Sequence, residues 1–424
     1  MGIFDKPLHQ DLLQIAEQLE QQIIGVKRRI EDVVEQNQLK VLRAFQSYKV
    51  SDFHFAGSTG YGYNDRGREL IDDVYASVFG CEAALVRPHI VSGTHAISTA
   101  LFGVLRPGDE LLVITGTPYD TLQKVIGKSG EAGNQGTLAD WGVSASIVPL
   151  DKYGQPQYEQ IRSAIHERTK CIAIQRSRGY EWRPSFLVEQ IAQMTKFVKS
   201  IRPDLIVFVD NCYGEFTEIL EPTDVGVDLM AGSLIKNPGG GIATTGGYIV
   251  GRKRYIEQCA YRLTAPGIGA EVGAMLHTNR EILHGLFLAP HIVGQALQGA
   301  VFAAAAYASY GLETNPCWDD SRTDLIQAVR FTNAESLLRF VRSIQHSSPV
   351  DAHVTPEPWD MPGYEHQVVM AAGTFIQGAS LELTADAPIR EPYIAYMQGG
   401  LTYAHVKWAV LYSLSEIFQH HFDN

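Results

Sequence analysis

The sequence predicts an α/β fold, because short apolar runs of strand length alternate with segments of helical periodicity. Continuous apolar runs of this kind are typical of strands that are buried on both faces of a parallel sheet. Between the last two runs, the apolar residues of 187–201 recur at three- and four-residue spacing and predict a crossover helix. The four predicted strands are LLVIT (111–115), ASIVPL (145–150), CIAIQ (171–175) and LIVFVD (205–210).

Three further segments complete the predicted organisation. Residues 12–46 have helical spacing without a strict heptad, which favours a packing helix at a subunit or domain surface over a short coiled coil. The segment TAPGIGAEVG (264–273) interrupts the alternation and is expected to lead into a long connecting helix, and a last helix is expected near 402–420. The expected parts are an N-terminal helical segment (1–50), a large α/β domain (51–285) and a smaller α+β domain (286–424).

Composition and charge narrow the class of protein. Of the 424 residues, 45% are hydrophobic and 19% are charged, which is ordinary for a soluble globular enzyme. The formal charge of −12 argues against a nucleic-acid partner, which normally requires a basic surface. Five scattered cysteines without a CxxC pair, no signal-peptide pattern and no apolar run of membrane-spanning length lead us to expect a cytoplasmic protein without a membrane partner.

Candidate binding residues are sought where strands end, since α/β sheets bind ligands beyond the carboxyl ends of their strands. Ser92, Gly93 and Thr94 open a predicted helix, where main-chain N–H groups and hydroxyls form a phosphate cradle. The alternative interpretation is an ordinary helix cap. Tyr119 follows the strand at 111–115, and its ring either stacks on a flat ligand or closes the core.

Asp210 and Lys236 carry charge into apolar surroundings. Asp210 ends the strand LIVFVD and needs a partner, because burying an unpaired charge is costly. That partner could be a metal ion, a cationic side chain in a salt bridge, a protonated ring nitrogen, or a loop that donates hydrogen bonds. Lys236 ends the apolar stretch LMAGSLI shortly before three glycines. Apolar surroundings favour the neutral amine, a nucleophile able to form a Schiff base, unless the amine reaches solvent.

Together these residues are the set that pyridoxal 5′-phosphate (PLP) requires. They supply a phosphate cradle, a stacking ring, an acid for the pyridinium nitrogen and a Schiff-base lysine, in that order along one α/β pattern. Motifs for three other kinds of site are absent. Lys236 precedes its glycines, whereas the lysine of a phosphate-binding P-loop follows them. The zinc-binding motif HExxH does not occur, and VSGTH does not match the GxSxG motif of serine hydrolases. PLP is therefore the predicted cofactor, and without a carboxylate cluster in the sequence no metal is expected.

Seven long strings carry a family resemblance: GYGYNDRGRELIDDVYASVFG, RPHIVSGTHAI, QRSRGYEWRPS, VDNCYGEF, GSLIKNPGGGIATTGGYIVG, MPGYEHQVVMAAGTFIQGAS and LTADAPIREPYIAYMQGGLTYAH. The chain resembles the fold-type-I PLP enzymes of the Cys/Met-metabolism class, the cystathionine lyase and methionine γ-lyase group. More narrowly, and through these strings over nearly the whole chain, it is similar to the branch of aluminium-resistance or methionine γ-lyase-like proteins. The resemblance implies a PLP-dependent transferase-like fold (aspartate aminotransferase type I), a three-layer sandwich with a smaller C-terminal α+β domain.

The resemblance also implies roles for individual residues. Lys236 would form the Schiff base with PLP, and Asp210 would pair with the pyridinium nitrogen. Tyr119 would stack on the ring and protonate a leaving thiolate. The phosphate would be held by Ser92, Gly93, Thr94 and Ser233.

One implied phosphate contact departs from the family. In the lyases, a Tyr-Ser-Arg stretch of the neighbouring subunit reaches the phosphate, and here Tyr61 to Tyr63 stand at that place. Tyr63 thus replaces an arginine, for which Arg66 or Arg68 would compensate. A site shared between subunits implies at least a homodimer, and the wider family implies a dimer of dimers.

Two further contacts, one to the cofactor and one to the substrate, are less specific. The partner of the PLP ring oxygen is expected in the stretch Gln175 to Arg178, but the sequence does not show which of these residues it is. Arg390 is the candidate for the substrate carboxylate, since its planar fork suits bidentate binding; the alternative is a surface arginine beside a turn.

The implied reaction is elimination of a β- or γ-thiolate from a sulfur-containing amino acid, with Lys236 as the base that removes the α-proton. The products would be a thiol, ammonia and a keto acid. The alternatives are γ-replacement, aldol cleavage or transamination at the same site, or a non-catalytic PLP-binding or metal-response protein.

Overall fold

The structure is a computed structural model that describes residues 2–57, 62–127, 135–361 and 366–419. The chain forms two compact units. One comprises Asn37–Phe287, and the other comprises Met1–Gln36 together with Leu288–Asn424. Two long helices, α1 (Gln10–Ser47) and α8 (Asn279–Ser309), each contribute residues to both units.

The unit Asn37–Phe287 is built on a seven-stranded sheet with the order β1-β7-β6-β5-β4-β2-β3. The strands from β3 to β6 in that order are parallel to their neighbours, whereas β7 is antiparallel to both β1 and β6. All four strands predicted from apolar runs are present, and the predicted parallel pairing is confirmed. The strands are β1 (Ala83–Arg87), β2 (Glu110–Val113), β3 (Ser144–Ile147), β4 (Thr169–Gln175), β5 (Ile206–Asp210), β6 (Leu229–Ser233) and β7 (Gly247–Gly251).

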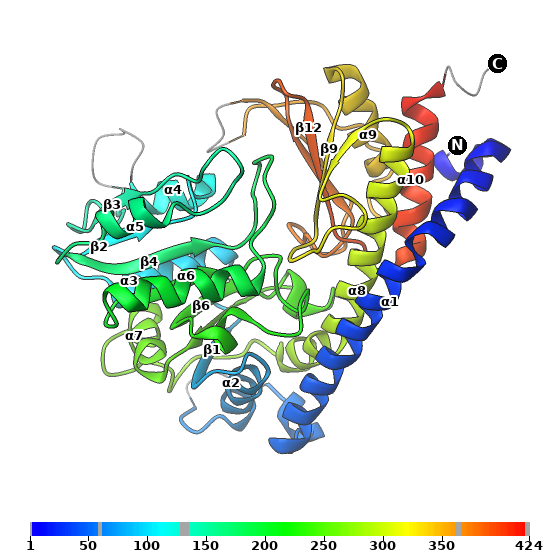
Figure 1. Ribbon diagram of the computed structural model, residues 1–424. Coiled ribbons are helices and arrows are strands. Elements are labelled where there is room, and N and C mark those ends of the chain that lie inside the picture. Colours follow the sequence, from blue (N-terminus) through cyan, green and yellow to red (C-terminus); the bar gives the residue numbers. More distant parts are fainter. Residues whose placement is uncertain (1, 58–61, 128–134, 362–365, 420–424) are drawn as a thin grey trace. The chain divides into compact units, whose positions relative to one another are not determined.

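Helices flank this sheet on both faces, which gives the unit three layers (Figure 1). On one face, α3 and α7 pack closely because Gly103 has no side chain; a Cβ there would lie 3.0 Å from the Cys259 Cα. On the opposite face, Tyr75 of α2 approaches Tyr248 of β7, with ring centroids 6.3 Å apart. The helices are α2 (Arg66–Val78), α3 (Gly93–Val104), α4 (Asp120–Ile126), α5 (Tyr158–Ala164), α6 (Val188–Ile201), α7 (Lys253–Leu263), η2 (Asp52–Phe55), η3 (Pro222–Val225) and η4 (Asn237–Gly239).

The alternation of side chains along the central strands brings the candidate residues to one face. In β5, Ile206 and Phe208 belong to the apolar core shared with α3 and α7, and Asp210 continues the same alternation. Ser233 of β6 and Gln175 of β4 follow the same pattern at the ends of the two neighbouring strands. These three polar side chains therefore lie beyond the apolar core on the face that α3 covers.

The other unit holds a five-stranded antiparallel sheet with the order β10-β11-β12-β9-β8. Its helix α9 packs against this sheet, and α10 packs against α9. The predicted helices at 12–46 and 402–420 correspond to α1 and α10, and the predicted connecting helix is α8. The elements are β8 (Glu313–Asn315), β9 (Ile326–Arg330), β10 (Val368–Ala371), β11 (Thr384–Pro388), β12 (Ile394–Gln398), α9 (Ala334–His346), α10 (Tyr403–Ile417) and η1 (Ile3–Asp5).

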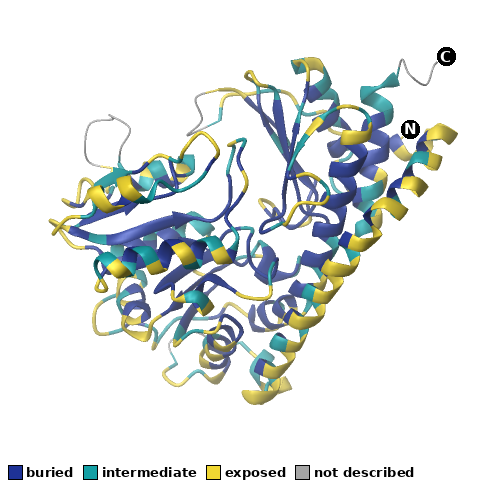
Figure 2. Cartoon of the chain, in the orientation of Figure 1, coloured by how far each residue is buried: buried dark blue, intermediate teal, exposed yellow. Residues whose placement is uncertain are grey.

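Burial follows the layers of each unit. Figure 2 shows the strands of both sheets mostly buried, whereas the outward faces of the surrounding helices are exposed. The helix α8 is long and apolar enough to cross a membrane by length and composition, but 72% of its most apolar window is buried inside the protein. A buried helix of a soluble protein has the same character. The five cysteines all lie in the described residues, and none is in a disulfide.

Candidate active site

Lys236 lies three residues beyond the end of β6, directly before the short helix η4. Its Nζ is 3.8 Å from the centroid of the Tyr213 ring. The glycine run after it is required by packing, since a Cβ on Gly239 would lie 1.7 Å from the Leu234 carbonyl oxygen. Gly240 then adopts a positive φ of 55°, which glycine tolerates without strain. The chain can therefore turn sharply just after the lysine.

Asp210 ends β5 and is buried. Its Oδ1 accepts a hydrogen bond of 3.1 Å from the Cys212 N–H. Burial raises the pKa of Asp210, while the Cys212 N–H and the charge of Lys236 oppose that rise. No ion pair joins Asp210 to Lys236 among the interactions of the described residues, so the two opposite charges act on each other at longer range.

The expectation that apolar surroundings keep Lys236 neutral is wrong for the residues as they stand. Burial alone would lower the pKa of Lys236, but negative charge on Cys212, Tyr213 and Asp210 raises it above its usual value. The pKa of the Cys212 thiol is itself raised, chiefly by burial, so Asp210 is the main source of negative charge at neutral pH. The amine is therefore an ammonium group in the protein without a cofactor.

The start of α3 faces the ends of β5 and β6. A Cβ on Gly93 would lie 3.1 Å from the Cys212 Sγ and 3.6 Å from the Ser233 Cβ, so only a glycine leaves space here. The Ser233 Oγ is buried and has no hydrogen-bond partner among the described residues. A buried hydroxyl without a partner, next to the N–H groups of a helix start, is what a phosphate group would satisfy.

The two other residues of this helix start are already engaged. The Ser92 Oγ accepts a hydrogen bond of 3.1 Å from the His95 N–H, so it caps α3 as the alternative interpretation proposed. The Thr94 Oγ1 lies 3.0 Å from the Thr121 Oγ1 of α4. Their main-chain N–H groups still point out of the helix start, as in any α-helix.

Tyr119 is the residue that precedes α4. Its N–H donates a hydrogen bond of 2.7 Å to the Gln175 Oε1, which fixes it to the end of β4. The Tyr119 ring meets the Tyr180 ring edge to face, with centroids 5.9 Å apart. Gly179 has a φ of +60°, and a Cβ there would contact the Tyr119 ring at 3.4 Å. The loop after β4 therefore holds the tyrosine in place.

In the stretch Gln175 to Arg178, some polar groups are hydrogen-bonded within the protein and one hydroxyl is not. The Gln175 Nε2 donates to the Ser177 carbonyl at 3.0 Å, and the Arg178 N–H donates to the Ser185 Oγ at 3.0 Å. The Ser177 Oγ is buried and has no hydrogen-bond partner within the described parts of the chain. Ser177 is thus the group of this stretch that a ligand would satisfy.

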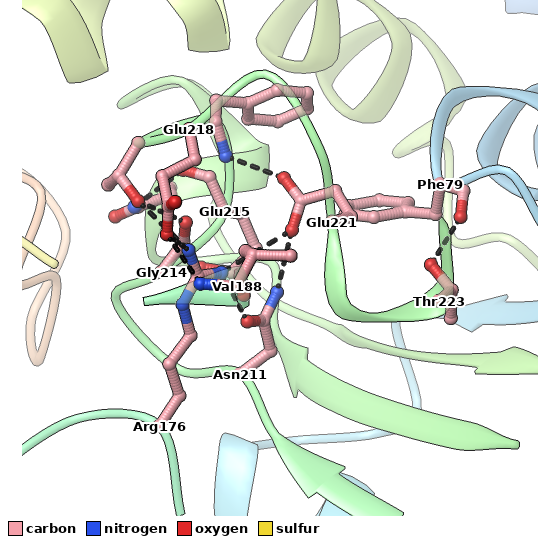
Figure 3. A network of polar contacts seen from close by, with 12 residues as sticks. Phe79, Arg176, Val188, Asn211, Gly214, Glu215, Glu218, Glu221 and Thr223 are labelled. Carbon is pink, nitrogen blue, oxygen red and sulfur yellow. Dashed lines mark hydrogen bonds and ion pairs between the residues drawn. The ribbon is translucent and has the colours of Figure 1, made fainter. Parts of the chain in front are cut away.

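Arg176 belongs to a separate buried network, drawn in Figure 3. Its guanidinium donates to the Asn211 Oδ1 at 2.8 Å and to the Glu218 Oε1 at 2.9 Å. The Glu221 Oε2 lies 3.6 Å from the Arg176 Nη1 and accepts a hydrogen bond of 3.1 Å from the Asn211 Nδ2. Figure 3 also shows the Glu218 carboxylate accepting from the Val188 N–H, at 3.0 Å. Arg176 is therefore committed to the protein itself.

Arg68 does not replace the phosphate-binding arginine that is missing at Tyr63. Arg68 is fully buried, and its guanidinium donates to the carbonyls of Gly62, Glu271 and Gly273. The side chain of Arg66 lies over the Phe53 ring, 5.9 Å from its centroid.

Three predicted contacts stay predictions. Tyr63 is 64% exposed, and Tyr61 lies outside the described residues. Arg390 is an exposed residue directly after β11, in the unit that holds the smaller sheet. Its carboxylate-binding role rests on the sequence alone.

Comparisons with known proteins bear directly on this arrangement. The sequence model of the methionine γ-lyase family matches residues 12–418. The chain belongs to the methionine γ-lyase family. The Bacillus subtilis protein YnbB is 56% identical over 98% of this chain and 99% of its own. A Listeria monocytogenes structure, described as a candidate cystathionine beta-lyase involved in aluminum resistance, is 57% identical and has a TM-score of 0.94, covering 96% of this chain and 100% of that one.

A more distant structure shows the shared fold alone. The pyridoxal-5′-phosphate-dependent protein YhfS from Escherichia coli is 16% identical and has a TM-score of 0.63, covering 92% of this chain and 97% of that one. The predicted family and the predicted fold of a large three-layer α/β part with a smaller sheet-containing part are confirmed.

The residues of this chain fit the cofactor of such a family. Lys236 offers an amine for covalent attachment, Asp210 offers a buried acid, and the Ser233 Oγ offers an unsatisfied hydroxyl beside the start of α3. No group of three or more metal-ligating side chains occurs in the described ranges.

Sequence reasoning missed two partners of this site. Tyr213 and Glu215 both lie in the string VDNCYGEF, directly after Asp210. The only signal for them was this proximity to Asp210 in the sequence, because no spacing predicts that Tyr213 contacts Lys236 or that Glu215 interacts with its charge.

Proposed function

We propose that the protein is a PLP-dependent carbon–sulfur lyase that acts on a sulfur-containing amino acid. One observation carries the proposal: Lys236, Asp210 and the unsatisfied Ser233 hydroxyl gather at adjacent strand ends of a methionine γ-lyase family chain. The similar Listeria protein, whose printed description is a cystathionine beta-lyase candidate, supports the same reaction class.

In this proposal each residue has a stated task. Lys236 binds the cofactor covalently and, once released, accepts the α-proton of the substrate at its Nζ. Asp210 keeps a proton on the cofactor's ring nitrogen by its negative charge. Ser233 and the main-chain N–H groups of Gly93 and Thr94 bind the phosphate. When bound, PLP supplies the electron-withdrawing ring that makes the α-proton acidic.

The remaining steps fall to residues whose roles come from the sequence. Tyr119 donates a proton to the departing sulfur, so that a thiol leaves as the carbon–sulfur bond breaks. Hydrolysis then yields ammonia and a keto acid. Arg390 binds the substrate carboxylate, Tyr61 and Tyr63 reach the phosphate of a neighbouring subunit, and the enzyme works as a cytoplasmic homodimer or dimer of dimers. A site shared in this way requires that the isolated monomer be inactive.

The test is a panel of amino acids assayed for released thiol, ammonia and keto acid. Cystathionine, methionine, cysteine and homocysteine are incubated with the purified enzyme, with and without an added thiol as acceptor. We expect keto acid and thiol from at least one substrate, and at least a hundredfold less from the Lys236→Ala variant. Products that form only with the acceptor would assign γ-replacement instead. Bound PLP without any turnover would contradict the proposed activity.

A further inference from the structure

Tyr213 is the residue closest to the reactive lysine that the proposed reaction does not use. The Nζ of Lys236 lies over its ring at 3.8 Å from the centroid. Tyr213 also has a positive φ of 73°, which is uncommon for a residue other than glycine, asparagine or aspartate. Such backbone conformations cost free energy and persist where the surrounding structure imposes them.

Contacts on both sides of Tyr213 impose this conformation. The Asn237 Nδ2 donates to the Tyr213 carbonyl at 3.0 Å and to the Glu215 carbonyl at 2.9 Å. Because Asn237 directly follows Lys236, one side chain ties the loop of the tyrosine to the loop of the lysine. The next residue, Gly214, packs on the buried guanidinium of Arg176, where a Cβ would approach the Nη1 to 2.6 Å. The ring is thus held by a rigid frame.

The charged and titratable groups that act on Lys236 are Asp210, Cys212, Tyr213 and Glu215. Burial raises the pKa of the Cys212 thiol well above its usual value and that of Glu215 to about 8, so both are mainly protonated at neutral pH. Asp210 makes no hydrogen bond or ion pair with the amine among the described residues. The closest favourable contact of the ammonium group is therefore Tyr213, through the face of its ring and through a hydrogen bond with its side chain.

We propose that Tyr213 is a positioning residue whose ring holds the protonated amine of Lys236, both in the apoenzyme and after the amine has accepted the α-proton. The inference rests on the proposed function, in which Lys236 alternates between attachment to PLP and release. An aromatic face attracts a cation through its quadrupole, and more strongly where water is excluded. When released Lys236 accepts the α-proton it becomes an ammonium group, which the ring holds close to the substrate. That group must lose its proton and leave the ring before it attaches again.

The test compares wild type with Tyr213→Phe and Tyr213→Leu in the apoenzyme. Both variants keep a side chain with a Cβ at the same positive φ, so backbone strain is matched across the series. PLP is added over a range of pH, attachment is fixed with borohydride, and the rate of label incorporation at Lys236 is measured by peptide mass spectrometry. The rate reports the neutral fraction of the amine.

We expect Tyr213→Phe to stay closer to wild type than to the leucine variant, since the ring face remains and only the hydroxyl is lost. In Tyr213→Leu the pH midpoint of attachment should fall by about one unit, so that attachment at neutral pH becomes about tenfold faster. An unchanged midpoint in the leucine variant would overturn the proposal, as would a phenylalanine variant that behaves like leucine. If wild type itself attaches no PLP at Lys236, the proposed function fails, which is a different outcome.

A second measurement does not depend on the leucine variant folding. Reductive methylation of the wild-type apoenzyme with ¹³C-formaldehyde labels Lys236, and its signal is identified by its loss in Lys236→Arg. Methyl protons above an aromatic ring resonate upfield, so we expect this signal upfield of the other dimethyl-lysines. A signal at the ordinary position would contradict the placement of the amine over the Tyr213 ring.

Discussion

Two buried polar clusters meet at the end of β5, where Asp210 and Asn211 are consecutive residues. In the cluster around Arg176, the guanidinium contacts Asn211, Glu218 and Glu221, and the acids also accept main-chain N–H groups. In the cluster around Lys236, the ammonium group lies over the Tyr213 ring. Among the described residues, the Cys212 N–H is the one main-chain donor to Asp210. The Ser233 hydroxyl has no partner within the described residues.

This difference separates a structural network from a binding site. Buried charges that are paired and hydrogen-bonded fix a shape, and here they fix the loop that carries Tyr213. Buried polar groups left without partners cost free energy, so they persist where a ligand satisfies them. The first cluster should therefore govern stability, and the second should govern cofactor binding with little effect on the stability of the apoenzyme.

The largest expected effect is on stability and comes from Arg176→Met. The substitution leaves the buried Glu221 and the partly buried Glu218 without their cation, which should lower the free energy of unfolding by about 3–5 kcal/mol. Lys236→Met removes a cation that makes no ion pair among the described residues. This substitution should change the free energy of unfolding by less than about 1 kcal/mol. Both are measured by urea unfolding of the apoenzyme.

The exposed Arg280 provides the control for that pair of variants, because its side chain is 67% exposed. Arg280→Met should change the free energy of unfolding by no more than about 0.5 kcal/mol. Equal destabilisation by Arg176→Met and Lys236→Met would remove the distinction between the two clusters.

A smaller effect is expected from Ser233→Ala, and it should appear in cofactor binding. A hydrogen bond to a charged phosphate contributes about 1.5–3 kcal/mol, so PLP should dissociate about ten- to a hundredfold more readily. The apoenzyme should be as stable as wild type or more so, because the lost hydroxyl was buried without a partner. Equilibrium dialysis and urea unfolding measure the two quantities. A destabilised apoenzyme with unchanged PLP affinity would assign Ser233 to the protein's own packing.

The smallest effect concerns the pH dependence of stability at Glu215. Burial raises the pKa of this carboxyl from 4.5 to about 8, and its Oε1 lies 2.5 Å from the Tyr248 Oη. Between these two pH values the folded chain binds a proton that the unfolded chain lacks, so this contribution to stability is complete below about pH 4.5 and is lost as the pH rises to about 8.

Glu215→Gln removes this titration. The stability of the variant relative to wild type should therefore increase with pH between these limits, by up to about 1.4 kcal/mol per pH unit. The same substitution at the exposed Glu335 gives a matched control, against which the slope of Glu215→Gln is compared. A constant difference between Glu215→Gln and wild type across this range would mean that Glu215 is ionised in the folded protein.

Local patterns in the sequence predicted much of this fold. The strands β2, β3, β4 and β5 and the helix α6 were each predicted within a few residues, because apolar runs and helical spacing are properties of contiguous segments. The position of β7 was not predictable, since its antiparallel pairing with both β1 and β6 depends on residues far apart in the chain.

The candidate site was predictable in its residues but not in its electrostatics. The strand-end rule located Asp210 and the apolar run located Lys236, but the charge on the lysine depends on its interaction with Asp210 and on Tyr213 from another loop. Likewise, Arg68 looked available for a phosphate, although it is held by carbonyls from residues 62, 271 and 273. Pairings across such separations leave no periodic signal in the sequence.

All the proposed roles at this site depend on Lys236 being the covalent attachment point of the cofactor. Borohydride reduction of the PLP-loaded enzyme, followed by digestion and mass spectrometry of every lysine-containing peptide, measures this directly. We expect a phosphopyridoxyl group on the peptide containing Lys236, at about one per chain, and none on that peptide in Lys236→Arg. A label on another lysine, or equal labelling of the Lys236→Arg variant, would show that Lys236 is not the attachment point.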